Sequence, residues 1–324
     1  MTPHSPGLSG AARSFKGRGP HHDEGLSLVS LSDVNEIELL ILKRMRELTM
    51  GDHRSMAPGS GFDFVGLRDW QAGDRPSAID WPQSTLTNFM PLVVREFEQA
   101  STASVVIVAD GSGSTRCAIN GIPIAAGVAR AIATIGMSAV FFQDRLGLLT
   151  FDTDLQHLLG VRPRIGRGQV LHCLDAYEHQ GGSEDVKAAG SLSATISSFI
   201  RRTAMIPFVS DFLFGDPATV LHELAALNSI HDVFIVLIDA AFAFQLPPTS
   251  AGWIDAFDVE TGRSRIMSRA ALAGMADRVR EWQDGVEQAA KAADIDLVRV
   301  GIDPEASDLA LIGFVAERRS RKVS

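Results

Sequence analysis

Cysteine is scarce in this 324-residue chain, which contains only Cys117 and Cys173. Two cysteines exclude a disulfide framework and a zinc site built from several thiolates, and they suit a reducing compartment. Basic residues are also few: Lys and Arg total 30 against 39 for Asp and Glu, which gives a formal net charge of −9. This deficit argues against general nucleic-acid binding, which depends on cationic contacts to phosphates.

A secretory signal is lacking as well. The first 22 residues contain neither Asp nor Glu and no apolar core, so we expect a flexible tail over residues 1–31. The run 122–142 is long enough to cross a bilayer. Arg130 lies near its middle and strand-like segments flank it, which favours a buried helix. We therefore expect a cytoplasmic protein with no membrane span.

Short apolar runs rich in β-branched residues alternate with helical segments from residue 104 onward. Such runs occur at 104–109, 146–151, 204–209 and 233–238. Continuous apolar strands separated by helices are typical of a parallel sheet that is covered on both faces. The sequence therefore predicts an α/β fold with a doubly wound, mostly parallel sheet.

The pattern of the chain suggests four parts. These are a tail over 1–31, a helix and β-rich segment over 32–99, the α/β domain over 100–302, and a C-terminal segment with a basic tail over 303–324. We expect residues 62–99 to form a small β-rich unit in which Trp70 and Trp81 are at least partly buried. Arg318 and Arg319 are expected to be solvated.

Polar side chains follow two of the predicted strands directly. Asp110, Ser112 and Ser114 come after the first strand, spaced as D-x-S-x-S, and Asp211 follows a later one. Because carboxyl ends of parallel strands meet at one edge of a sheet, we expect these residues to lie close together, with Asp110 in a loop beyond the sheet. Carboxylate and hydroxyl oxygens suit Mg²⁺. Alternatively, the motif is a Gly/Ser turn in which Asp110 caps the next helix.

One further acid and one arginine-rich stretch belong to the same analysis. Asp239 follows the strand at 233–238 and is a third candidate acid near this edge. Residues 160–168 carry Arg162, Arg164 and Arg167. This stretch could bind phosphate, but we favour a solvated loop near the metal edge.

The stretch SVVIVADGSGS, followed by a small-residue helix and a later FVSDF, resembles a von Willebrand factor A domain. The resemblance implies a metal-ion-dependent adhesion site formed by Asp110, Ser112, Ser114 and Asp211, which would take Mg²⁺, Mn²⁺ or Ca²⁺. Such sites usually have a Thr in a middle loop, but residues 166–169 contain none. Gln169 could supply an oxygen there, directly or through water, and we expect weak metal binding.

The preceding segment narrows the resemblance. Gly73-Asp74, Ile79-Asp80-Trp81, Ser84 and the acidic approach 94–98 are similar to the bacterial domain-of-unknown-function 58 family. That resemblance implies two partners, a MoxR-type AAA+ ATPase and a client protein. The pair would act in chaperone-like protein maturation or in metal or cofactor insertion, and some relatives belong to systems that assemble methanol dehydrogenase.

The sequence thus favours a metal-dependent protein–protein interaction module rather than an enzyme. One alternative is a metal-dependent phosphate or ester hydrolase that uses Asp110 or Asp211. It lacks a paired general base and a D-x-D nucleophile motif. The other alternative is a metal-free scaffold, which the missing middle-loop Thr favours.

Overall fold

A computed structural model describes residues 27–51, 63–71, 79–86, 89–98, 103–119, 122–152, 155, 157–244, 253–258, 263–301 and 303–321. The chain divides into two compact units. The sheet unit comprises Met1–Leu48 together with Ala103–Ser324, and the hairpin unit comprises Thr49–Thr102. The N-terminal helix therefore groups with the sheet, whereas the sequence had joined it to the β-rich segment.

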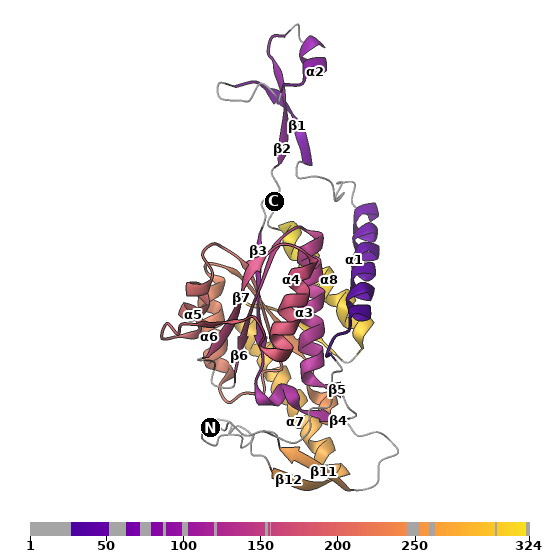
Figure 1. The fold of residues 1–324 in the computed structure, drawn as a ribbon, viewed down its shortest axis with the longest axis vertical. Coiled ribbons are helices and arrows are strands. Elements are labelled where there is room, and N and C mark those ends of the chain that lie inside the picture. The colour runs from indigo at the N-terminus through magenta and orange to yellow at the C-terminus, as the bar shows by residue number, and fades with distance from the viewer. Residues whose placement is uncertain are drawn as a thin grey trace. The chain divides into compact units, whose positions relative to one another are not determined.

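The sheet unit contains a seven-stranded sheet in the order β13-β10-β9-β3-β6-β7-β8 (Figure 1). Its strands are β3 (Ser104–Asp110), β6 (Arg145–Phe151), β7 (Leu158–Arg164), β8 (Glu184–Val186), β9 (Met205–Ser210), β10 (Asp232–Ile238) and β13 (Asp296–Val300). The five strands from β13 to β6 are parallel, while β7 and β8 each pair with their neighbour antiparallel. The predicted doubly wound, mostly parallel α/β fold is confirmed.

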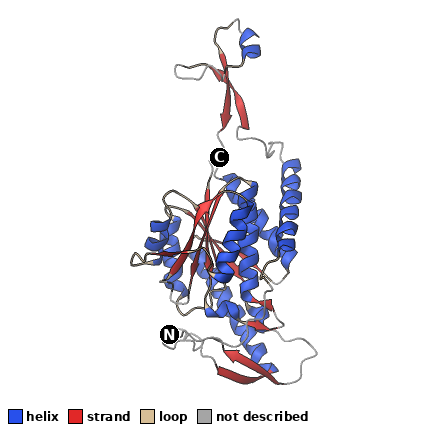
Figure 2. Cartoon of the chain, in the orientation of Figure 1, coloured by secondary structure: helices blue, strands red, loops and turns tan. Residues whose placement is uncertain are grey.

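Helices cover both faces of this sheet, as Figure 2 shows. One face packs against α3 (Ile124–Phe141), α4 (Arg167–His179) and α8 (Pro304–Arg321), and α1 (Leu31–Gly51) joins the same hydrophobic core. The other packs against α5 (Leu192–Phe199), α6 (Pro217–Asn228) and α7 (Arg269–Ala292). Successive residues of a strand point to opposite faces, so Ile107 lies in the first core and Val106 and Val108 in the second. Because both faces are covered, the central strands are apolar at successive positions.

Shorter elements complete the sheet unit. They are η2 (Gly113–Arg116), η3 (Ala241–Phe244), and the two-stranded pairs β4 (Ala118–Ile119) with β5 (Ile122–Pro123) and β11 (Trp253–Asp258) with β12 (Arg263–Ser268). Among the residues that the structure describes, α3 alone has the length and hydropathy of a membrane span. Because 72% of it is buried inside the sheet unit, it behaves as a core helix.

The hairpin unit is the small β-rich unit predicted from the sequence. It pairs β1 (Asp63–Asp69) with β2 (Val93–Glu98) antiparallel and carries the short helix α2 (Trp81–Leu86). The buried Ser84 hydroxyl accepts a hydrogen bond from the Val93 amide at 2.9 Å and so ties α2 to β2. Trp70 and Trp81 are 40% and 56% exposed, more than predicted.

The C-terminal segment differs most from its prediction. It forms α8, which buries Leu311 and Ile312 against the sheet. Arg318 pairs with Asp232 and Asp296, at the amino ends of β10 and β13. Arg319 pairs with the buried Asp144 at 3.0 Å. The expectation that these two arginines are solvated is wrong, because α8 carries them to the carboxylates that precede the strands.

Candidate functional site

The candidate site lies where the neighbouring parallel strands β3 and β9 end. Ala109 is in register with Val209, so Asp110 and Ser210 leave the sheet side by side, and Asp211 follows at once. Asp110 is the last residue of β3 and is fully buried. Our expectation that it lies in a loop beyond the sheet is therefore wrong. The turn begins one residue later, where the Gly111 amide donates to the carbonyl of Phe151 at 2.9 Å.

Hydrogen bonds join the four predicted side chains into one cluster. The amide of Ser112 donates to Asp110 Oδ1 at 2.9 Å, and the hydroxyls of Ser112 and Ser114 lie 3.0 Å apart. Ser114 Oγ then donates to Asp211 Oδ2 at 3.0 Å. Ser210 Oγ closes the ring by donating to Asp110 Oδ2 at 2.5 Å. The prediction that these residues meet at one edge of the sheet is confirmed, and we call them, with Ser210, the acidic cluster.

The acidic cluster holds two carboxylates away from water, with no cationic side chain paired to them among the described residues. Asp110 and Asp211 are fully buried, and no Lys or Arg among the described residues forms an ion pair with either. Burial raises the pKa of both carboxyls, and the charge of Asp110 adds to the effect on Asp211, whose pKa rises to about 7. A buried pair of like charges is stabilised by a shared proton or by a bound cation.

The donor set fits a hard cation. Every polar side-chain atom of the cluster is an oxygen, which suits Mg²⁺, Mn²⁺ or Ca²⁺ and disfavours softer metals. Within the described part of the chain, no group of three or more His, Cys, Asp or Glu is placed to hold a metal. A cation here would therefore depend on two carboxylates, on hydroxyls and on water. Asp239 does not join them: its Oδ1 accepts from the Ala241 amide and its Oδ2 lies 3.9 Å from Arg299.

Gln169 lies at the other end of the sheet. Its Nε2 donates to the carbonyls of Leu146 and Arg162, at 3.1 and 3.0 Å. Leu146 lies opposite Val105, one residue from the start of the β6 ladder, whereas Asp110 is opposite Phe151 at the far end of the same ladder. The structure therefore does not bring Gln169 to the acidic cluster. The stretch 160–168 likewise lies at the opposite edge from the one expected, because β7 runs back along β6.

Three side chains that the sequence analysis did not single out donate hydrogen bonds to main-chain carbonyls of the acidic cluster and of the residue after it. The Tyr177 hydroxyl, from α4, donates to the main-chain oxygen of Asp110 at 2.8 Å. The fully buried Gln283 donates through Nε2 to the carbonyls of Asp211 and Ile238, at 2.9 and 2.8 Å. Beside it, Trp282 Nε1 donates to the carbonyl of Phe212 at 2.8 Å. In the sequence, the only hint of this role was Gln283 itself, a polar residue next to the apolar face of an amphipathic helix.

Fold and site together define an α/β protein with an all-oxygen acidic cluster at the ends of two central strands. The family model described as "Protein of unknown function DUF58" matches residues 66–286. This match spans more than half of the chain, which therefore belongs to the DUF58 family.

Comparison with other proteins adds little beyond the family. No curated protein matches the chain. Among solved structures, the chain is similar to the crystal structure of the conserved hypothetical protein BatB from Bacteroides thetaiotaomicron. The two share 12% sequence identity with a TM-score of 0.41, over 68% of this chain and 99% of that one.

Proposed function

We propose that this protein is a metal-dependent protein–protein interaction module of the von Willebrand factor A type. The observation that supports this most is the hydrogen-bonded convergence of Asp110, Ser112, Ser114 and Asp211 at the strand ends. A bound Mg²⁺ would supply a positive charge with coordination positions that a carboxylate of a partner protein can complete. Both carboxylates of the cluster are tied into hydrogen bonds with the serines and backbone amides, an arrangement that suits ligand positioning.

Some residues of this chain would bind the cation directly, and others would position those ligands. Asp110 and Asp211 would carry the negative charge, and the hydroxyls of Ser112 and Ser114 would complete the oxygen donors. Tyr177 and Gln283 bind the main-chain oxygens of the two aspartates and so orient their carboxylates. Backbone carbonyls fixed in this way leave the side chains few alternative directions, which is what pre-organises a ligand site.

Ser191 is a further candidate donor for the same edge. β8 runs parallel to β6 because both are antiparallel to β7, so β8 ends at the edge that carries Asp110. Ser191 follows it and caps α5 by accepting from the Ala194 amide at 3.2 Å. A hydroxyl between β8 and α5 is a better counterpart of the middle-loop Thr of von Willebrand factor A domains than Gln169 is. The variant Ser191→Ala should then weaken metal binding without abolishing it.

The partner is proposed from the family resemblance. We propose that a MoxR-type AAA+ ATPase binds this protein in the cytoplasm and that the pair matures a client protein, for example by chaperone-like folding or by metal or cofactor insertion. Assembly of methanol dehydrogenase is one process of that kind. The sequence contains no G-x-x-x-x-G-K-[ST] phosphate loop, so the energy of ATP hydrolysis would come from the partner.

Titration calorimetry with Mg²⁺ and Mn²⁺ tests the metal step. We expect one weak site in the wild-type protein, no binding in Asp211→Asn, and unchanged binding in the control Asp239→Asn, which alters a strand-end acid outside the cluster. A wild-type protein that takes up no divalent ion at millimolar concentration would contradict the proposal. A pull-down with the ATPase, with and without EDTA, then tests whether the metal carries the partner contact.

One observation favours the metal-free scaffold as a second candidate. Each of the four carboxylate oxygens of the cluster already accepts a hydrogen bond: those of Asp110 from Ser112 and Ser210, and those of Asp211 from Leu213 and Ser114. A closed network of this kind can be purely structural. If partner binding survives both EDTA and Asp110→Asn, the scaffold is the correct reading.

A further inference from the structure

Exposed arginines gather at the edge of the sheet opposite the acidic cluster. We call them the arginine edge: Arg145, Arg162, Arg164, Arg201 and Arg202. Arg164 ends β7 in register with Leu146, so it lies beside Arg145, the first residue of β6. Arg162 places its guanidinium 4.5 Å from the centre of the Phe199 ring and donates to the Phe199 carbonyl at 3.3 Å. Arg201 follows that residue by two positions.

The arginine edge is largely without compensating charge. Within the described residues, the side chains of Arg145, Arg164, Arg201 and Arg202 form no hydrogen bond or ion pair. Arg162 lies 3.6 Å from Glu184, but both side chains are more than half exposed, which makes this a weak pair. Most other described arginines of the sheet unit have an acidic partner, although the exposed Arg116 and Arg278 have none among the described residues.

Arg130 and Arg299 show that difference. Each is 2.7 Å from a carboxylate, that of Asp308 and that of Asp284 respectively. The chain has a net charge of −9, so it contains enough acidic side chains to pair with the arginine edge as well. Unpaired guanidinium groups side by side repel one another, so their concentration at one edge favours a ligand of opposite charge.

We propose that the arginine edge binds an acidic segment of a partner protein. Guanidinium groups hold carboxylates through two parallel hydrogen bonds, which a lysine cannot do. Neighbouring strands are about 4.8 Å apart, so β6 and β7 present these groups at a spacing that successive acidic side chains of a short segment can follow. The charge of −9 opposes a long polyanion such as nucleic acid over the rest of the surface.

This surface is separate from the acidic cluster. The two lie at opposite ends of the same strands, and β3 has seven residues, which at about 3.3 Å per residue is on the order of 20 Å. The proposal therefore does not depend on metal binding. EDTA and Asp211→Asn are expected to leave the binding of an acidic segment unchanged.

Fluorescence anisotropy with a labelled oligoglutamate peptide tests the proposal. In the variant Arg164→Glu/Arg201→Glu we expect binding to weaken about tenfold or more, and to weaken further as salt rises. The matched control is Arg278→Glu/Lys291→Glu, which makes the same change of charge at two exposed positions of α7. Its affinity should stay within about twofold of the wild type.

Two results would overturn the assignment. One is equal peptide affinity in the arginine-edge variant and in the α7 control, including the case in which the wild type binds no peptide. The other is tighter binding of a single-stranded oligonucleotide of the same charge than of the peptide, which would assign the edge to nucleic acid. If the charge reversal prevents folding, as circular dichroism would show, the neutral pair Arg164→Gln/Arg201→Gln serves for the same comparison.

Discussion

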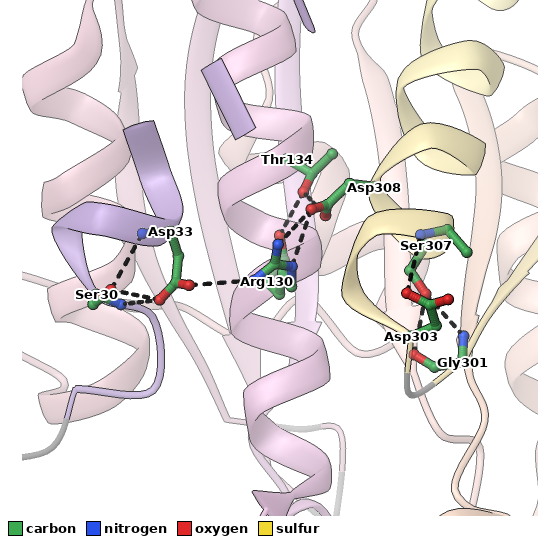
Figure 3. Close-up of polar contacts among 9 residues, drawn as sticks. Ser30, Asp33, Arg130, Thr134, Gly301, Asp303, Ser307 and Asp308 are labelled. Carbon is green, nitrogen blue, oxygen red and sulfur yellow. Dashed lines mark hydrogen bonds and ion pairs between the residues drawn. The ribbon is translucent and has the colours of Figure 1, made fainter. Parts of the chain in front are cut away.

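The sheet unit holds buried carboxylates at two places that differ in their electrostatic surroundings. In the first, Arg130 of α3 lies between Asp33 of α1 and Asp308 of α8 (Figure 3). Its guanidinium donates to Asp308 Oδ2 at 3.0 and 2.7 Å, and Thr134 Oγ1 donates to Asp308 Oδ1 at 2.7 Å. In the second, Asp110 and Asp211 accept hydrogen bonds from hydroxyls and backbone amides, and no described Lys or Arg pairs with them.

The difference separates a structural use of buried charge from a candidate functional one. Burial raises the pKa of Asp308 above its ordinary value, and the contacts with Arg130 and Thr134 offset part of that rise from within the fold. No cation among the described residues compensates the acidic cluster in this way, so its negative charge would be neutralised by a bound cation or by a proton. A buried carboxylate pair without a basic partner is therefore the more informative signal of function.

Removing the cation from the first cluster should produce the largest effect. In Arg130→Met, Asp308 stays buried without its ion-pair partner, so we expect the free energy of unfolding to fall by about 3–5 kcal/mol. Urea denaturation measures it. The double variant Arg130→Met/Asp308→Leu should recover most of the loss, because an apolar pair of similar volume replaces both charges. Equal stability of the single variant and the wild type would show that the network is not structural.

The acidic cluster should make the free energy of unfolding fall as pH rises, because the pKa of Asp211 is raised in the folded state. The carboxyl of Asp211 titrates at about 7 when folded, against 3.8 for its ordinary value, so the folded state binds more protons between these limits. The stability contributed by the protonated form is complete below about pH 4 and is lost as pH rises through about 7. In the absence of divalent ions, we expect a fall of up to about 1.4 kcal/mol per pH unit across this window.

Asp211→Asn is the control for that dependence. It keeps the shape of the side chain and removes the titration, so the decline of unfolding free energy between pH 4 and pH 7 should flatten. The variant should also be more stable than the wild type at pH 8, because one of two buried like charges is gone. An unchanged pH profile in Asp211→Asn would mean that Asp211 does not carry the dependence.

Tyr177→Phe should have the smallest effect. It removes the hydroxyl that donates to the main-chain oxygen of Asp110 and preserves the packing of the ring. We expect a loss of about 1 kcal/mol in unfolding free energy, together with weaker metal binding. Calorimetry distinguishes a positioning role from simple packing: a variant that loses stability but binds Mg²⁺ as the wild type does would show that Tyr177 does not orient the cluster.

The central strands and the acidic cluster were predictable because one physical rule links them. Buried parallel strands are continuously apolar, and polar residues that follow such strands lie at one edge of the sheet. This rule alone predicted that Asp110 and Asp211 lie close together. The depth of Asp110 was not predictable in this way, because the sequence does not say where the strand ends and the turn begins.

The antiparallel strands were missed for the converse reason. β7 reads LLGVRPR, and its glycine, proline and two arginines obscure the apolar pattern of a strand near the edge of the sheet. Missing this reversal placed Gln169 at the wrong end of the sheet, because the segment that directly follows an antiparallel strand starts from the opposite end. The supporting residues Tyr177 and Gln283 lie on helices far along the chain, and only the packing of those helices reveals their partners.

The Arg130 network also constrains the order in which the protein can be completed during translation. Asp33 precedes Arg130 by 97 positions, and Asp308 follows it by 178. When α3 leaves the ribosome, α1 is already made and α8 is not, so Arg130 can at first bond only to Asp33. The pairing with Asp308 forms after the whole sheet has been synthesised. A nascent chain halted before α8 would thus present an α3 face that lacks its most buried counter-charge.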